Sequence, residues 1–247
     1  MKADVVLTVA ESKRLIAKGV AALDFVQEKL KNGIIVVASG STNACLYEEL
    51  TGQQIDRRAY VTGRTVPATA GSGWEVEALP DLVLVNGEPA ADLDRLSALD
   101  RMEAGDIYIK GANALNYAVG VAGITIGNPR GGTIGGAMGT IIGKKLQLLI
   151  PVGLEKEVPF DIYEAVDLIS EPDEHLGHVY SLFPVQGTIF TEIEALEVLC
   201  GVDAYAVAAG GVAGAEGGLR LLLDGDADAV RAAVALVESI HGEPSLR

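Results

Sequence analysis

A run of four branched aliphatic residues, Ile34 to Val37, followed at once by a turn of small residues, constrains the fold of this chain more than any other feature. The stretch reads "IIVVASGSTNAC". An uninterrupted apolar run of this length is typical of a strand buried on both faces, as in a parallel sheet covered by helices. The residues that follow predict a helix that begins with Ser41 or Thr42 as N-cap and closes at Gly52.

Further strand patterns follow at intervals, in "RAYVTGRTV", "DLVLVNGEP", "DIYIKGANAL" and "LQLLIPVGL", and helical patterns separate most of them. Helices between strands indicate parallel crossovers, which are right-handed and leave ligand sites at the carboxyl ends of the strands. The fold class is therefore predicted as α/β. We expect a Rossmann-like three-layer domain with a mostly parallel sheet over residues 1–174, in which the first 30 residues supply a helix.

A second unit is expected after the polar segment "SEPDEHLGH". The pattern beyond it predicts strand 178–185, helix 191–200, strand 203–209, a glycine-rich hairpin, strand 219–224 and helix 226–241. The order β-α-β-β-α makes up most of a ferredoxin-like unit. Residues 175–247 are therefore predicted to form a C-terminal ferredoxin-like α+β lobe.

The charge of the chain limits its partners. With 34 acidic and 19 basic side chains among 247 residues, the formal net charge is −15. Nucleic acids and anionic membranes attract clustered Lys and Arg, so neither is expected as a partner, whereas a small anionic metabolite needs only a local set of donors. Asn128-Pro129-Arg130 interrupts the most apolar stretch and no signal-peptide pattern opens the chain, which predicts a cytoplasmic protein.

Three segments are candidates for anion binding because each places small residues, backbone N–H groups or a cation at a strand or helix end. Each has an ordinary alternative: a side-chain cap for the first, a solvated lysine beside a turn for the second, and close helix packing for the glycines of the third. The candidate ligand-binding residues are Ser39, Gly40, Ser41, Thr42, Lys110, Gly111, Asn113, Arg130, Gly131, Gly132 and Thr133.

Candidate catalytic residues are fewer. Glu75, Glu77 and Glu216 lie in glycine-rich stretches, where a carboxylate can serve as base or nucleophile, although solvation in a hairpin explains Glu216 as well. Lys110 is the expected electrostatic stabiliser. His175 and His178 have a weak spacing for a metal, and Cys45 and Cys200 lie far apart, so neither a metal site nor a cofactor is predicted.

These motifs together resemble the superfamily that joins ribose-5-phosphate isomerase, glucosamine-6-phosphate deaminase and the CoA transferases. Ser39-Gly40-Ser41-Thr42 is similar to the isomerases' phosphate-binding G-x-G-S-T turn, and the segment from Lys110 to Ala114 is similar to their K-G-G-G-A stretch. The run "GTIIGKKLQLLIPVG" resembles the second half of the superfamily. The isomerases' D-G-A-D-E segment has no counterpart, and Asn116-Tyr117 stands where their glutamate base is expected.

The resemblance implies a protein that binds a small phosphorylated or nucleotide-like metabolite, and an isomerase or transferase acting on sugar phosphates if it is an enzyme. The missing acids favour an alternative, a non-catalytic metabolite-binding or assembly module in which the C-terminal lobe mediates self-association. A third hypothesis is acyl-CoA transferase chemistry through a glutamate. A homo-oligomer is expected in each case.

Overall fold

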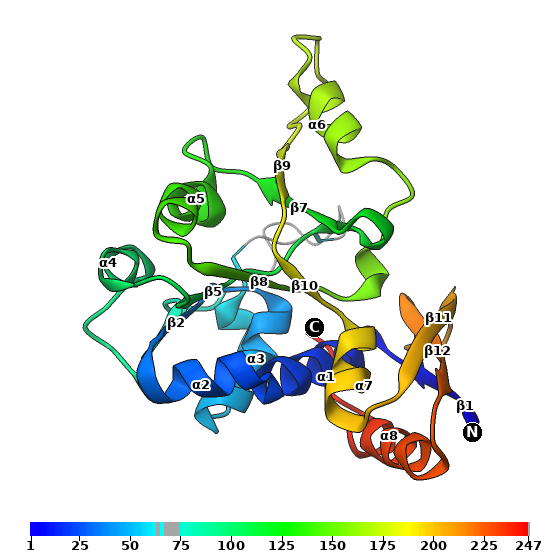
Figure 1. Ribbon diagram of the computed structural model, residues 1–247. Helices are drawn as coiled ribbons and strands as arrows, with labels where there is room; N and C mark the ends of the chain where they lie inside the picture. The colour runs from blue at the N-terminus through cyan, green and yellow to red at the C-terminus, as the bar shows by residue number, and fades with distance from the viewer. Residues whose placement is uncertain (63–64, 67–74, 247) are drawn as a thin grey trace.

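A six-stranded sheet lies at the centre of the molecule (Figure 1). The computed structural model describes residues 1–62, 65–66 and 75–246. The strand order is β10-β8-β5-β2-β3-β4, and the first four strands run parallel to one another. The α/β class and the mostly parallel sheet are thus confirmed. The strands are β2 (Ile34–Val37), β3 (Leu82–Val85), β4 (Glu88–Pro89), β5 (Ile107–Ile109), β8 (Gln147–Pro151) and β10 (Thr188–Phe190).

Helices cover both faces of this sheet because its strands are apolar on both sides. Ile35 and Val37 of β2 point into one core, and Ile34 and Val36 point into the other. Figure 1 shows the helices of the first core below the sheet and those of the second above it. The lower helices are α1 (Val9–Ala22), α2 (Asp24–Asn32) and α3 (Ser41–Thr51), and the upper ones are α4 (Arg95–Arg101) and α5 (Gly132–Lys144).

The strand β3 runs antiparallel to β2, whereas the sequence predicts parallel crossovers. The chain after α3 returns to the edge of the sheet where β2 ends, since Gly40 N donates to Tyr60 O over 2.8 Å. The buried Tyr60 hydroxyl then bridges the two strands by donating to Val37 O and accepting from Leu82 N. Residues 57–60 form the 3-10 helix η1 (Arg57–Tyr60), so the strand predicted from "RAYVTGRTV" is wrong there, and its residues 63–64 lie outside the described residues.

Two smaller antiparallel sheets complete the fold. One has the order β1-β12-β11, and the other has the order β6-β7-β9. Their strands are β1 (Lys2–Leu7), β12 (Gly218–Asp224), β11 (Asp203–Gly210), β6 (Ala114–Asn116), β7 (Val121–Ile126) and β9 (Ser181–Val185). The remaining helices are α6 (Ile162–Ser170), α7 (Glu192–Cys200), α8 (Ala227–Ser239) and the 3-10 helices η2 (Tyr117–Val119) and η3 (Leu154–Lys156).

The C-terminal strands pair differently from the sequence prediction. The strand expected at 178–185 is β9, which pairs with β7 instead of β11 or β12. The third strand beside β11 and β12 is β1, which precedes the helical segment predicted within the first 30 residues and is not predicted from the sequence. Pairs β7·β9, β8·β10 and β1·β12 all cross the predicted boundary between residues 174 and 175. Each of the three sheets therefore contains strands from both expected units.

Helix α1 packs closely against α7 and so connects the central sheet to the C-terminal elements. A Cβ on Gly19 would lie 2.8 Å from Ala195 Cα, so only glycine permits this approach. Thr8 and Glu11 form a capping box at the start of α1, with Thr8 N donating to the Glu11 carboxylate over 2.8 Å. The capping box thus defines where α1 begins, and Gly19 allows α1 to pack closely against α7.

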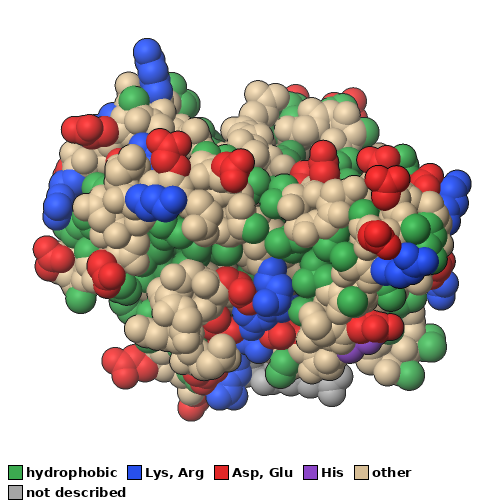
Figure 2. Space-filling view, turned by 60° about the horizontal axis from the view of Figure 1, so that its bottom comes forward, with side chains coloured by type: hydrophobic (Ala, Val, Ile, Leu, Met, Phe, Trp, Pro, Cys, Tyr) green, Lys and Arg blue, Asp and Glu red, His purple; other side chains and the backbone are tan. Residues whose placement is uncertain are grey.

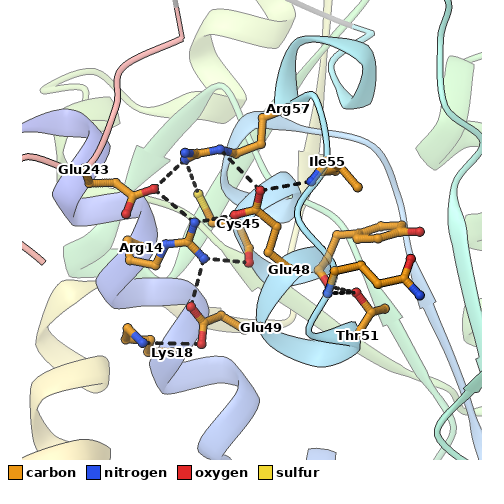
Figure 3. A network of polar contacts seen from close by, with 11 residues as sticks. Arg14, Lys18, Cys45, Glu48, Glu49, Thr51, Ile55, Arg57 and Glu243 are labelled. Atoms are coloured by element: carbon orange, nitrogen blue, oxygen red, sulfur yellow. Dashed lines mark hydrogen bonds and ion pairs between the residues drawn. The ribbon is translucent and has the colours of Figure 1, made fainter.

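A buried cluster of charges joins α1, α3, η1 and the C-terminal segment (Figure 3). The Arg14 guanidinium contacts Glu48, lies 2.8 Å from Glu49 and 3.0 Å from Glu243, and also donates to Cys45 O. Arg57 contacts Glu243 at 2.6 Å and Glu48 at 3.6 Å. Every charge in the cluster has an opposite partner, as buried ions require.

Acidic side chains outnumber basic ones in the sequence, and Figure 2 shows Asp and Glu side chains scattered over one face with Lys and Arg side chains among them. None of the helices within residues 1–62, 65–66 and 75–246 combines the length and the apolar character that crossing a bilayer requires.

Candidate functional site

A cleft of about 1100 Å³ opens at the carboxyl edge of the parallel strands. The three segments predicted to bind an anion line it together. Residues 39–42 follow β2, residues 110–113 follow β5, and residues 130–133 lead into α5. The carboxyl ends of neighbouring parallel strands meet at one edge of a sheet, which explains why distant segments converge here. Gly131 is the one predicted ligand-binding residue that does not line the cleft.

The first turn of α3 faces the cleft without a side-chain cap. Its N-cap is Gly40, so the prediction of Ser41 or Thr42 as the cap is wrong. Two N–H groups before the helix are already bonded, Ser39 N to Asp81 Oδ1 at 2.7 Å and Gly40 N to Tyr60 O. The Thr42 hydroxyl is buried and has no hydrogen-bond partner within the described residues. This turn therefore offers hydrogen-bond donors to an anion.

The start of α5 also lacks a side-chain cap. Its N-cap Gly131 has φ +81° and the next residue, Gly132, has φ +59°. A Cβ on Gly131 would lie 2.9 Å from Gly135 Cα, so this tight entry requires glycine. The backbone N–H of Arg130 is held by Asn128 Oδ1 at 2.8 Å, while the Arg130 side chain is exposed at the cleft. A second uncapped helix N-terminus thus lines the same space.

Lys110 lines the same cleft as these two helix starts and lies on the loop after β5. Its ammonium makes one hydrogen bond within the described residues, to Gly111 O at 3.5 Å. Burial, and after it the positive charge of Lys156, lower the pKa of Lys110 to about 8, although the negative charge of Asp81 partly opposes them. Lys156 follows β8 and donates to Ala112 O over 2.8 Å, and burial lowers its pKa as well. Two lysines thus lie at adjacent strand ends.

The lining of the cleft is positive although the protein is strongly negative. Among the described residues that line it, Asp81 is the one carboxylate. Asp81 is already engaged, because Arg95 lies 2.7 Å from it and Ser39 N donates to it. The cationic side chains of the lining are Lys13, Arg95, Lys110, Arg130 and Lys156.

Four charged residues of the cleft lining are not predicted from the sequence. Lys156 comes five residues after the end of β8, so the rule that selected Lys110 also applies to it. Asp81 precedes β3 and reaches the cleft because β3 is antiparallel, so that its first residue lies beside the last residue of β2. Lys13 and Arg95 lie on α1 and α4, whose approach to the cleft depends on helix packing that no local pattern specifies.

The three predicted catalytic glutamates lie elsewhere. Glu75 and Glu77 are exposed and do not line the cleft. Glu216 is exposed in the hairpin between β11 and β12 and accepts from Gly214 N over 2.9 Å. Asn113 does line the cleft, and its Oδ1 accepts from Thr125 N at 3.0 Å. The cleft therefore gathers the predicted binding residues without the predicted acids.

A buried carboxyl group lies behind Lys156. Glu192 is fully buried, and its Oε2 accepts from Leu154 N over 3.0 Å. Its Oε1 has no hydrogen-bond partner within the described residues. Burial, and after it the negative charge of the neighbouring Glu155, raise the pKa of Glu192 to about 7. The carboxyl group is consequently poised to change its charge near neutral pH.

Within the described part of the chain, His, Cys, Asp and Glu form no group of three or more that could hold a metal ion. The cleft is therefore defined by cations and helix N-termini, which are partners for anions. Comparison with protein-family models, with curated proteins and with solved structures found no match for this chain.

Proposed function

We propose that the cleft binds a small phosphorylated or nucleotide-like metabolite. The observation that carries this proposal is the composition of its described lining: five cations, one engaged carboxylate and two uncapped helix starts in a protein of net charge −15. Unpaired N–H groups and the helix dipole both favour a phosphate group. A volume of about 1100 Å³ is ample for a ligand of nucleotide size.

The proposal includes a Rossmann-like interpretation of the central domain, which four parallel strands and a ligand edge at their carboxyl ends support. Helices α7 and α8 beside sheet β1-β12-β11 support an α+β lobe with some ferredoxin-like character. Isomerisation or group transfer on a sugar phosphate remains the proposed reaction class, with Lys110 as the stabilising cation. Glu75, Glu77 and Glu216 receive no role in it because they do not line the cleft.

The test is ligand binding by the Lys110→Met variant. Inorganic phosphate, pyrophosphate, sugar phosphates, nucleotides and CoA esters are compared by thermal shift, since a ligand of the folded state raises the melting temperature. We expect one phosphorylated class to stabilise the wild type. Loss of the Lys110 charge should weaken its binding by about tenfold or more, because charge-assisted hydrogen bonds contribute about 1.5–3 kcal/mol.

The matched control is Lys31→Met, which makes the same change at an exposed position of α2 outside the cleft. It should bind like the wild type. No shift with any phosphorylated probe would contradict the proposed function, and equal affinity of the two variants would remove Lys110 from the site.

A second candidate function, assembly through self-association, is favoured by strand β11. Within the described residues no strand pairs with its outer edge. Tyr205 and Val207 on it are each 52% exposed, and they lie beside a largely apolar groove of about 790 Å³. Unpaired edges with exposed apolar side chains are templates for another strand, and we propose that β11 of a second copy occupies this one.

Light scattering of Tyr205→Lys tests this assembly. We expect the wild type to be a dimer and the variant a monomer with a similar melting temperature, because a lysine on an edge strand opposes pairing. Tyr163→Lys on α6, equally exposed at 47%, is the control and should remain a dimer. A monomeric wild type, or a dimeric Tyr205→Lys variant, would contradict the assembly.

A further inference from the structure

We propose that Lys110 is a nucleophile that forms an imine with an aldehyde or ketone group of the ligand, so that the cleft takes phosphorylated carbonyl compounds. This inference rests on the proposed function for the phosphate end of the ligand. It adds a covalent step that electrostatic binding alone does not include.

The first argument is that the Lys110 ammonium has no carboxylate to hold it as a cation. Ion pairs within the described residues do not include Lys110, and Asp81, the carboxylate nearest to it in the cleft, is occupied by Arg95 and Ser39 N. A lysine kept only for charge normally faces an acid or open water. Lys110 instead is half-buried at a strand end, where desolvation favours the neutral amine.

The second argument is the presence of a neighbouring cation. Lys156 comes from the adjacent strand end, and its charge disfavours a proton on Lys110. A lysine beside another cationic group is a recurrent way to obtain a nucleophilic amine at neutral pH. The groups whose charges act on Lys110 are Lys156 from η3, Arg95 from α4 and Asp81 before β3, and two of these three favour the neutral amine.

The third argument selects Lys110 among the lysines of the cleft. The Lys156 ammonium is bound to Ala112 O at 2.8 Å, whereas the one hydrogen bond of Lys110 is long at 3.5 Å. Lys110 also follows β5, the strand between β2 and β8, so it lies at the middle of the carboxyl edge. A ligand whose phosphate lies at the start of α3 or α5 would share the cleft with this amine, because all three line it.

The chemistry balances without any oxidant or reductant. The neutral amine of Lys110 adds to the carbonyl carbon, a C–N bond forms, and the carbonyl oxygen takes up a proton while the nitrogen loses one. The carbinolamine hydroxyl then takes up a proton from solvent, the C–O bond breaks to release water, and the nitrogen lone pair forms the C=N bond of the protonated imine. Addition of water reverses the sequence and releases the ligand. The protonated imine withdraws electrons from the neighbouring carbon, which is useful to isomerisation and to carbon–carbon bond cleavage alike.

The experiment traps the imine with glyceraldehyde 3-phosphate as probe and cyanoborohydride as reductant. We expect one adduct per chain by intact mass and its location on Lys110 by peptide mapping. Lys110→Arg keeps the charge but not the nucleophile, so it should lose the adduct while retaining the thermal shift with inorganic phosphate. Lys31→Met should react like the wild type. An adduct spread over many lysines, or retained in Lys110→Arg, would overturn the imine.

The same samples separate this inference from the proposed function. A thermal shift with inorganic phosphate but no adduct on Lys110 would overturn the imine and leave anion binding intact. An adduct on Lys110 that forms equally well with unphosphorylated glyceraldehyde would support the amine and overturn the phosphate site. The absence of both a thermal shift and an adduct would overturn the imine and the proposed function together.

The dependence of trapping on pH provides a readout that a merely structural lysine would not move. Lys156→Met removes a charge that holds the pKa of Lys110 down, so that pKa should rise and less neutral amine should exist near neutral pH. The ratio of the trapping rate at about pH 7 to that at about pH 10 should fall, by about tenfold for each unit of pKa. An unchanged ratio would overturn the assignment of Lys156 as the activating neighbour.

Discussion

Replacement of Arg14 by methionine should lower the free energy of unfolding by about 3–5 kcal/mol, the largest effect we expect from any single substitution here. The Glu48 side chain is 2% exposed and contacts the Arg14 guanidinium directly. Without Arg14, Glu48 stays buried with only the longer contact to Arg57 as an ion pair and a hydrogen bond from Ile55 N at 3.4 Å, and Glu49 and Glu243 each lose a partner. Uncompensated buried charge is far more costly than a lost surface ion pair. Urea denaturation monitored by circular dichroism measures the change.

The control for this prediction is Arg58→Met. Arg58 pairs with Asp56 at 2.8 Å, but both side chains are more than two-fifths exposed. Exposed pairs contribute about 0–1 kcal/mol, so the same substitution here should have little effect. If the two variants lost equal stability, the Arg14 cluster would be no more than another surface ion pair. A partial recovery on adding Glu48→Leu to Arg14→Met would show directly that the stranded carboxylate is the cause.

The second large effect concerns the pH dependence of stability, which Glu192 should dominate near neutrality. Its pKa of about 7 in the folded protein lies above the ordinary value of about 4.3. A carboxyl group with a raised pKa contributes its full stability below the unfolded pKa, and this stability is lost as pH rises through about 7. The wild type should therefore lose about 3 kcal/mol between about pH 4 and pH 8 through this group.

Glu192→Gln should remove that loss, because the amide cannot ionise and its oxygen can still accept from Leu154 N. The measurement is the free energy of unfolding of both proteins across this pH range. Glu197→Gln removes the same formal charge from an exposed position on α7 and should leave the decline unchanged. If the free energy of unfolding changed with pH in the same way in the wild type and in Glu192→Gln, ionisation of Glu192 would not lower the stability of the fold.

The sequence predicts the centre of this fold well because the signals there are local. Ile34 to Val37 reads as a doubly buried strand, and each of the two cores takes alternate residues of it. The segments after β2 and β5 were selectable from their position at strand ends alone. The direction of β3 could not be predicted, because it depends on the hydrogen bonds of Tyr60 with Gly40 and Leu82, which only the tertiary structure brings together.

The pairing partners of the C-terminal strands could not be predicted for a related reason. The patterns identify strands 203–209 and 219–224 closely, but a pattern cannot say which third strand completes their sheet. Val5 of β1 pairs with Leu221 and Val6 pairs with Arg220, across more than 200 residues. Glu75, Glu77 and Glu216 were selected because they lie in glycine-rich surroundings, which indicate a loop but not what the loop faces, and none of the three lines the cleft.

The pairing of β1 with β12 also sets the order in which this protein can be assembled as it is synthesised. Strand β1 is translated before its partner, because Gly218–Asp224 follows it more than 200 residues later in the chain. Contacts this distant in sequence close slowly, because the entropy of the long intervening loop must be lost first. Val5 and Leu7 of β1, which are buried in the folded protein, stay uncovered for most of translation. Chaperones that shield apolar segments thus have a long opportunity to bind β1 before β12 is synthesised.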